Sequence, residues 1–230
     1  MKKSVLLLIC LICFICNSYG QRELPQNNPN YDMQSYHFGF ILGYSQQKLN
    51  IRYSEFMNSS SSNYQQILSD YEPGFNVGII MDLKIKDNYN IRVTPSFNFT
   101  DQKIYYNNGN YSVSQPQNSG LSNFELPIYL KYRSDRINNG RLYVLLGPKL
   151  SIDMSSFEKL SENENLEFKV RNYSIDIGFG VDIYFKYFKF APEIKYSYGI
   201  INILENQYNE YDNYIKSLST RTVLISLTFE

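Results

Sequence analysis

Apolar residues occupy every second position in successive segments between residues 74 and 229. From Tyr173 to Phe185 the odd positions hold Tyr, Ile, Phe or Val, and the even positions hold mainly Ser, Asp or Gly. A period of two is typical of a β-strand with one apolar and one polar face. Runs of about ten residues are long enough for a tilted strand to cross a bilayer. The pattern therefore predicts an all-β membrane barrel and not a soluble sandwich.

Eight segments with this alternation predict an eight-stranded antiparallel transmembrane β-barrel domain over residues 36–230. An even number of strands agrees with the rule for bacterial barrels. The predicted strands cover residues 37–53, 74–84, 89–105, 121–133, 141–154, 173–185, 188–200 and 220–229.

The connections between these strands alternate in length. The tight connections are near residues 86–88, 135–139 and 185–187, and the long polar ones are near residues 54–72, 107–120, 155–169 and 202–219. Outer-membrane barrels have short periplasmic turns and long extracellular loops. Both ends of the barrel domain are therefore expected on the periplasmic side.

The start of the chain predicts export. Residues 1–20 have the form of a signal peptide, with Lys2 and Lys3 followed by an apolar stretch over residues 5–15. Residues 21–35 are rich in Asn, Gln and Pro without any period, which predicts a flexible periplasmic segment. All three cysteines fall within residues 1–20, so we expect no disulfide, metal thiolate or cysteine nucleophile in the mature chain. The predicted location is the outer membrane of a Gram-negative cell.

Composition agrees with a lipid-embedded barrel. The chain has 22 basic and 22 acidic residues, and removing the two leader lysines leaves 20 against 22, a formal charge of about −2. This balance lacks the net basic charge typical of proteins that bind nucleic acid. The 22 Tyr and 15 Phe residues suit the aromatic girdles that contact lipid headgroups. Outer-membrane lipid is therefore an expected partner.

The polar faces of the predicted strands carry charges of both signs. An eight-stranded barrel is just wide enough for its inward side chains to fill it, and buried charges are tolerated when they are paired. An alternative is that two carboxylates, such as Asp176 and Asp182, bind a cation or perform acid–base chemistry. The predicted structural network in the lumen consists of Asp82, Arg92, Glu125, Lys131, Arg133, Lys149, Asp153, Asp176, Asp182, Glu193 and Lys195.

No motif predicts a catalytic, cofactor-binding or metal site. His37 is the only histidine. Its expected position, at the start of the first strand beside a flexible segment, offers no fixed partner for a Ser-His-Asp triad. Gly178 and Gly180 form no dinucleotide fingerprint because no βαβ unit surrounds them. We therefore expect no enzymatic activity, no cofactor and no small-molecule substrate.

Four prolines lie inside predicted strands, where each must remove one ladder hydrogen bond. They are Pro95, Pro127, Pro148 and Pro192. One interpretation is that they produce bulges that set the curvature of the wall. The other is that weakened pairing marks a face that docks against another membrane protein.

Several short motifs occur at the predicted strands and turns. They are Phe124-Glu125-Leu126-Pro127, Leu130-Lys131-Tyr132, Arg136-Ile137-Asn138-Asn139, Gly147, Ile177-Gly178-Phe179-Gly180-Val181-Asp182, Tyr187-Phe188-Lys189-Phe190 and Phe229-Glu230. On these motifs the chain resembles the PorT family, small outer-membrane barrels associated with the type IX secretion system and gliding motility in Bacteroidota. The resemblance implies a non-enzymatic role in protein export, with other secretion-system proteins as partners.

The predicted barrel limits what that role can be. A filled eight-stranded barrel cannot pass a folded protein, so we expect an accessory or assembly component and not the conduit. The alternative function is a stand-alone surface barrel whose outer loops bind an external ligand or surface. An outer-membrane enzyme is disfavoured by the scarcity of histidine and cysteine.

Overall fold

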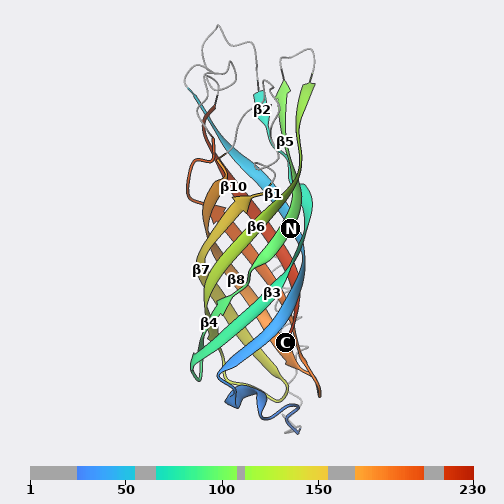
Figure 1. Ribbon diagram of the computed structural model, residues 1–230, viewed down its shortest axis with the longest axis vertical. Coiled ribbons are helices and arrows are strands. Elements are labelled where there is room, and N and C mark those ends of the chain that lie inside the picture. Colours follow the sequence, from blue (N-terminus) through green and yellow to red (C-terminus); the bar gives the residue numbers. More distant parts are fainter. Residues whose placement is uncertain (1–24, 55–65, 108–111, 155–168, 205–214) are drawn as a thin grey trace, which may run out of the picture.

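The computed structural model describes residues 25–54, 66–107, 112–154, 169–204 and 215–230, so the predicted signal peptide lies outside the described residues. The described chain forms one short 3₁₀ helix and ten strands (Figure 1). They are η1 (Tyr31–Met33), β1 (Tyr36–Tyr53), β2 (Gln66–Leu68), β3 (Glu72–Lys86), β4 (Tyr89–Val93), β5 (Ser96–Asn107), β6 (Ser112–Arg133), β7 (Gly140–Asp153), β8 (Arg171–Tyr184), β9 (Lys189–Gly199) and β10 (Ile215–Phe229). None of the described helices is long and apolar enough to span a membrane.

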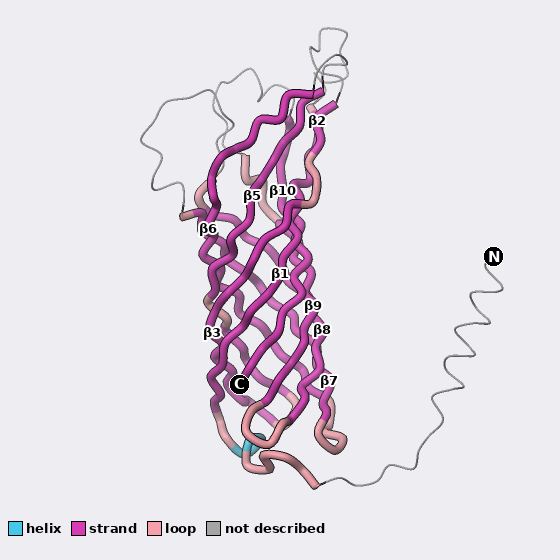
Figure 2. Tube along the Cα trace, turned by 90° about the vertical axis from the view of Figure 1, so that its right-hand side faces the viewer, coloured by secondary structure: helices cyan, strands magenta, loops and turns pink. Residues whose placement is uncertain are grey.

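The strand pairings close the sheet into a ring. Phe40 on β1 pairs with Phe229 on β10 at one edge and with Ile79 on β3 at the other, and all pairings are antiparallel. The ring continues from β10 through β9, β8, β7 and β6 to β4 and β5, which together occupy one position beside β3. The wall therefore has eight positions, as predicted, and Figures 1 and 2 show the tilted strands around one axis.

The predicted strand over residues 89–105 is interrupted at Thr94 and Pro95, which separate β4 from β5. Pro95 has no N–H to donate, although its carbonyl accepts a hydrogen bond from the Ile79 amide at 3.0 Å. The pairing with β6 has the same register on both sides of the break, with Val93 opposite Ile128 and Ser96 opposite Glu125. The proline thus breaks the ladder locally without changing the pairing.

Pro127 and Pro148 lie beside a second interruption. The amide of Thr94 donates to the Pro127 carbonyl at 3.3 Å, which places this proline next to the break between β4 and β5. Pairing between β6 and β7 stops after Pro127–Lys149 and resumes at Leu130–Leu146. Adjacent strands therefore carry neighbouring gaps in their ladders.

Three loop predictions are wrong in part. Residues 107–120 were expected to form a loop, but β5 and β6 pair as far as Asn107 and Ser112, so their hairpin extends beyond the wall. Likewise, β10 begins at Ile215, inside the loop predicted over residues 202–219. The loop predicted over residues 54–72 contains β2, which pairs with β5. Backbone pairing in water does not require an apolar face, so the alternation of residue types did not reveal these extensions.

The two faces of the wall differ as the alternation predicts. Ile177 on β8 is 58% exposed, whereas its neighbour Asp176 is 3% exposed. The same inversion, with apolar residues outside and polar residues inside, recurs along the other wall strands. It is the pattern expected when lipid is the outer solvent.

The barrel has two distinct ends. The short connections and η1 lie at one end, which we call the turn end, and Figure 2 shows η1 in cyan below the wall there. The long connections lie at the other end, which we call the loop end. The periplasmic position of the turn end is still a prediction.

Candidate functional site

The turn-end half of the lumen is organised around Arg92 on β4. Its Nε and Nη2 atoms donate to Asp82 of β3 at 3.0 and 2.8 Å. Nη1 donates to Glu193 of β9 at 2.6 Å, and Nη2 also donates to Glu230, which follows β10, at 2.7 Å. Asn90 donates a further hydrogen bond to Asp82. One buried guanidinium therefore connects three carboxylates from different parts of the wall.

Two lysines extend this network. Nζ of Lys131 lies 3.3 Å from Asp182, and Nζ of Lys189 lies 2.8 Å from Glu230 and 3.5 Å from Asp182. The side chains of all four residues are at most 1% exposed. Charges of this kind are tolerated out of water because each one has an opposite charge in contact.

Tyr143 on β7 fills the space beside these charges. Its hydroxyl donates to Glu193 at 2.6 Å, and Nζ of Lys131 lies 3.9 Å from its ring centroid. Lys195 also donates to Glu193 at 2.6 Å. A Cβ atom at Gly180 on β8 would collide with the Tyr143 ring. Glycine is required there because the ring crosses the lumen against the β8 backbone.

A second polar layer lies toward the loop end. Nζ of Lys149 is 3.3 Å from Glu125 and 3.8 Å from Asp176. The Tyr129 hydroxyl donates to Asp176 at 2.8 Å, and the Asn98 amide donates to Glu125 at 3.4 Å. This layer has one cation between two carboxylates, so it is less densely paired than the Arg92 layer.

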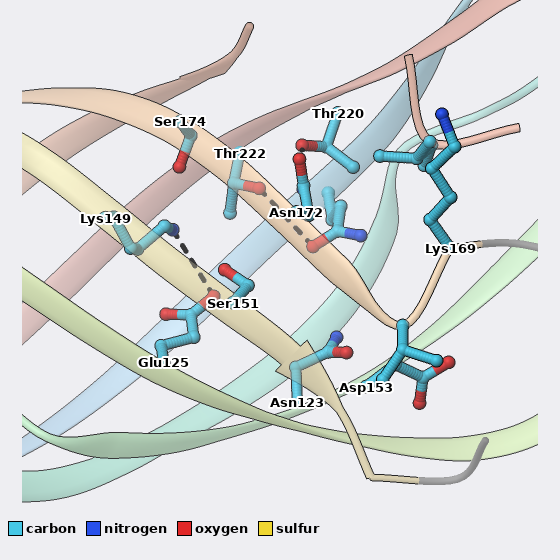
Figure 3. A pocket seen from close by; sticks show the side chains of 13 residues that line it. Asn123, Glu125, Lys149, Ser151, Asp153, Lys169, Asn172, Ser174, Thr220 and Thr222 are labelled. Atoms are coloured by element: carbon cyan, nitrogen blue, oxygen red, sulfur yellow. Dashed lines mark hydrogen bonds and ion pairs between the residues drawn. The ribbon is translucent and has the colours of Figure 1, made fainter. Parts of the chain in front are cut away.

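Beyond the Lys149 layer is a polar cavity of about 40 Å³ (Figure 3). Glu125, Lys149, Asn172 and Thr222 are among its lining residues. This volume holds a few water molecules at most. The cavity is therefore too small to pass a solute of the size of a peptide.

An apolar cluster lies at the loop end. Ile203 belongs both to this cluster and to the lining of the cavity, so the cluster adjoins the polar interior. Its buried members come from β1, β2, β10 and the segment that follows β9. They are Leu49, Ile67, Ile203, Leu204, Ile215 and Leu218.

The structure places most of the predicted lumen residues in the interior. Asp153 differs, since it is only half-buried and lines the cavity near the loop end. The remaining ten are buried: Asp82, Arg92, Glu125, Lys131, Arg133, Lys149, Asp176, Asp182, Glu193 and Lys195.

The alternative based on Asp176 and Asp182 finds no support in the geometry. Asp176 contacts Tyr129 and Lys149 in one layer, whereas Asp182 contacts Lys131 in the other. Over the described ranges, no group of three or more His, Cys, Asp or Glu residues is arranged to hold a metal ion.

Sequence reasoning left out two members of the network, Glu230 and Lys189. Both have the inward parity of their strands, since Glu230 alternates with Phe229, and Lys189 with Phe190. Parity could therefore have identified them. Tyr129 and Tyr143 also have the inward parity of their strands, but their residue type did not mark them as network members, because tyrosine is also common at lipid-facing positions.

The segment before β1, residues 25–35, was expected to be flexible, but it is folded against the turn end. Tyr31 is buried, its ring stacks on His37 with centroids 3.9 Å apart, and its hydroxyl donates to Glu230 at 2.8 Å. Asn27 bonds to Asn139 at 2.8 Å. Polar contacts with distant residues hold this segment in one conformation. Its amino-acid composition alone therefore did not predict that it is ordered. We call residues 25–35 the plug segment.

Asp32 anchors the plug segment among basic side chains. Its carboxylate lies 2.9 Å from Arg141, 3.5 Å from Arg136 and 3.7 Å from Arg133. Burial alone would raise the pKa of Asp32, but these three arginines outweigh burial and lower it below its usual range. Burial and the nearby Glu230 carboxylate raise the pKa of Tyr31, so its hydroxyl stays a hydrogen-bond donor.

Comparison with known proteins assigns the family. A sequence family described as "Outer membrane protein beta-barrel domain" matches residues 25–205. The chain belongs to this family. This outer-membrane β-barrel protein therefore has the location that its wall of outward apolar residues indicates. No curated protein sequence matches the chain.

Solved structures similar to this outer-membrane β-barrel protein have low sequence identity. Neisserial surface protein A has 12% identity and a TM-score of 0.42, covering 85% of this chain and 98% of its own. OprG from Pseudomonas aeruginosa has 10% identity and a TM-score of 0.46, with 84% and 94% covered. Ail, the attachment invasion locus protein of Yersinia pestis, has 15% identity and a TM-score of 0.38, with 86% and 99% covered.

Proposed function

We propose that this outer-membrane barrel is a non-enzymatic accessory or assembly component of type IX protein secretion, with a contribution to gliding motility, and that it is not the conduit. The motifs around Phe124, Arg136 and Ile177 that resemble the PorT family support this assignment. The membership of the chain in an outer-membrane barrel family is consistent with it.

The observation that carries the proposal is the filled lumen. Arg92 connects Asp82, Glu193 and Glu230 across the interior, and the cavity above the Lys149 layer has a volume of about 40 Å³. An exported protein cannot pass through such a barrel. The protein must therefore act through its outer wall, its loops or its turn end, in contact with other membrane or periplasmic proteins.

Deletion of the gene tests the proposed function. The culture supernatant of the deletion strain should lack several unrelated exported proteins, and wild-type protein supplied in trans should restore them. The level of an unrelated outer-membrane barrel, measured by immunoblot, controls for a general envelope defect. Normal export in the deletion strain would contradict the proposal.

The projecting β5–β6 hairpin favours a second candidate function. Its ladder continues past the wall to Asn107 and Ser112 at the loop end, where the long connections would contact the medium. In this case the protein is a surface barrel that binds an external ligand or surface through its loops. The same deletion strain would then export normally but lose binding to that surface.

A further inference from the structure

The wall carries an unbalanced basic patch where β1 pairs with β10. Neither strand contains an Asp or Glu residue. Near the loop end the two strands carry four basic residues, Lys48 and Arg52 on β1 and Lys216 and Arg221 on β10. We call these four residues the seam patch.

The pairing of the strands places like charges together. Lys48 lies directly opposite Arg221, and Arg52 is opposite Ser217, the residue after Lys216. Like charges directly opposite each other destabilise a strand pair. Within the described ranges no carboxylate lies in ion-pair contact with any residue of the seam patch. The patch therefore lacks a counter-charge from the described protein.

Aromatic rings orient the two central cations. Nζ of Lys48 lies 5.4 Å from the centroid of the Tyr71 ring, and Cζ of Arg221 lies 5.6 Å from that of Tyr198. The Nε atom of Arg221 is buried and has no hydrogen-bond acceptor among the described residues. One donor of this arginine is thus held in place without a partner.

The height of the patch on the wall indicates what could neutralise it. On β1, the lipid-facing residues Leu42 and Tyr44 precede Lys48 with the same parity, and on β10, Arg221 is followed by Ile225 with the same parity. The patch therefore begins where the apolar surface ends. That level corresponds to the lipid headgroups, where tyrosines are also common. At the turn end, by contrast, Lys84 pairs with Asp87 at 3.0 Å.

We propose that the seam patch binds a phosphate group of a lipid headgroup, and that this lipid is the phosphorylated glycolipid of the outer leaflet. A phosphate carries the missing negative charge, and its oxygens accept hydrogen bonds from Arg221 and Lys48. The loop end is expected to face the outside of the cell, which selects the outer leaflet. This inference does not depend on a role in secretion.

Binding of purified lipid A to the folded full-length mature protein in neutral detergent tests the proposal. Each basic residue near an anionic leaflet contributes about 1 kcal/mol, or about a fivefold change in affinity. Lys48→Gln combined with Arg221→Gln should therefore weaken binding by about 25-fold, as measured by native mass spectrometry. The charge-preserving variant Arg221→Lys should bind more weakly than the wild type but more tightly than the double Gln variant.

The matched control replaces two exposed basic residues at the turn end, Lys86→Gln and Lys186→Gln. This variant should bind lipid A as the wild type does, and all variants should keep the heat-modifiable migration of a folded barrel. Enzymatically dephosphorylated lipid A should bind the wild type weakly. Equal binding of dephosphorylated lipid A, or an equal loss in the control variant, would overturn the proposal. Displacement of lipid A by an equal concentration of inorganic phosphate would show a site for the free ion instead.

Discussion

The two ends of the lumen are packed by different physical means. At the turn end, Arg92 and its carboxylates fill the interior, and the plug segment covers them with Tyr31 and Asp32. At the loop end, an apolar cluster that includes Leu49 and Leu218 packs beside a small polar cavity. Packing at the turn end depends on matched charges, and packing at the loop end depends on removing apolar area from water.

This difference affects how each end tolerates change. A buried ion pair adds little net stability, but loss of one partner leaves an uncompensated charge and is expensive. Burial of apolar surface stabilises the fold in proportion to the buried area. The free energy of unfolding therefore falls gradually as buried apolar atoms are removed. Stability at the turn end should therefore depend on single changes of charge, whereas stability at the loop end should depend on changes in the volume of buried side chains.

The largest effect should come from Arg92→Met. This substitution leaves Asp82, Glu193 and Glu230 without their shared cation, so the free energy of unfolding should fall by about 3–5 kcal/mol. Urea unfolding in lipid vesicles measures this free energy of unfolding. Lys149→Met, which affects only two carboxylates, is the matched control and should cost less. Equal losses would show that the two charged layers do not differ.

Leu218→Ala should have the next largest effect. The side chain is fully buried in the apolar cluster, so truncation should cost about 2–4 kcal/mol, and high salt should not change this cost. Leu227→Ala is the control, because Leu227 faces lipid and is 42% exposed. The same urea measurement with and without salt checks the prediction. A strong salt dependence would mean that charge, and not apolar packing, stabilises the loop end.

Asp32→Asn should have a smaller and pH-dependent effect of about 1–2 kcal/mol on docking of the plug segment. The folded-state pKa of Asp32 is lowered, so its ion pairs contribute above its ordinary pKa of about 3.9 and are lost as the pH falls through the folded value. Hydrogen exchange of residues 25–35 should be faster in the variant at neutral pH. The difference between wild type and variant should begin to shrink below about pH 4 and vanish once the pH is below the lowered folded-state pKa of Asp32, and a constant difference would contradict this.

The smallest effect concerns conductance. Deleting residues 25–33 removes most of the plug segment, including Tyr31 and Asp32, but keeps Arg92 and its three carboxylates. A planar bilayer containing either the wild type or the deletion variant should therefore show no ion channel. Channel activity that appears only after the deletion would show that the plug segment, and not Arg92, closes the turn end.

The alternation of residue types predicted the wall and most of its interior, because each strand has a period of two and lipid covers one face. Asp82, Arg92 and Glu193 were recognised in this way. The same rule covered Glu230 and Lys189, although neither was counted among the predicted lumen residues. It could not predict the plug segment, whose order depends on tertiary partners such as His37 and Arg141. It also could not predict the β5–β6 hairpin beyond the wall, because backbone pairing there needs no lipid.

The sharing of Arg92 among three acidic residues has a consequence for how such a barrel diverges over time. A replacement at position 92 leaves several buried carboxylates without their cation at once. Single substitutions at this position should therefore be rare. Natural relatives that lack this arginine are expected to have changed residues 82, 193 and 230 as well, or to supply a cation from a neighbouring strand. Residues of the interior should therefore be replaced together during evolution, whereas lipid-facing residues should be replaced one at a time.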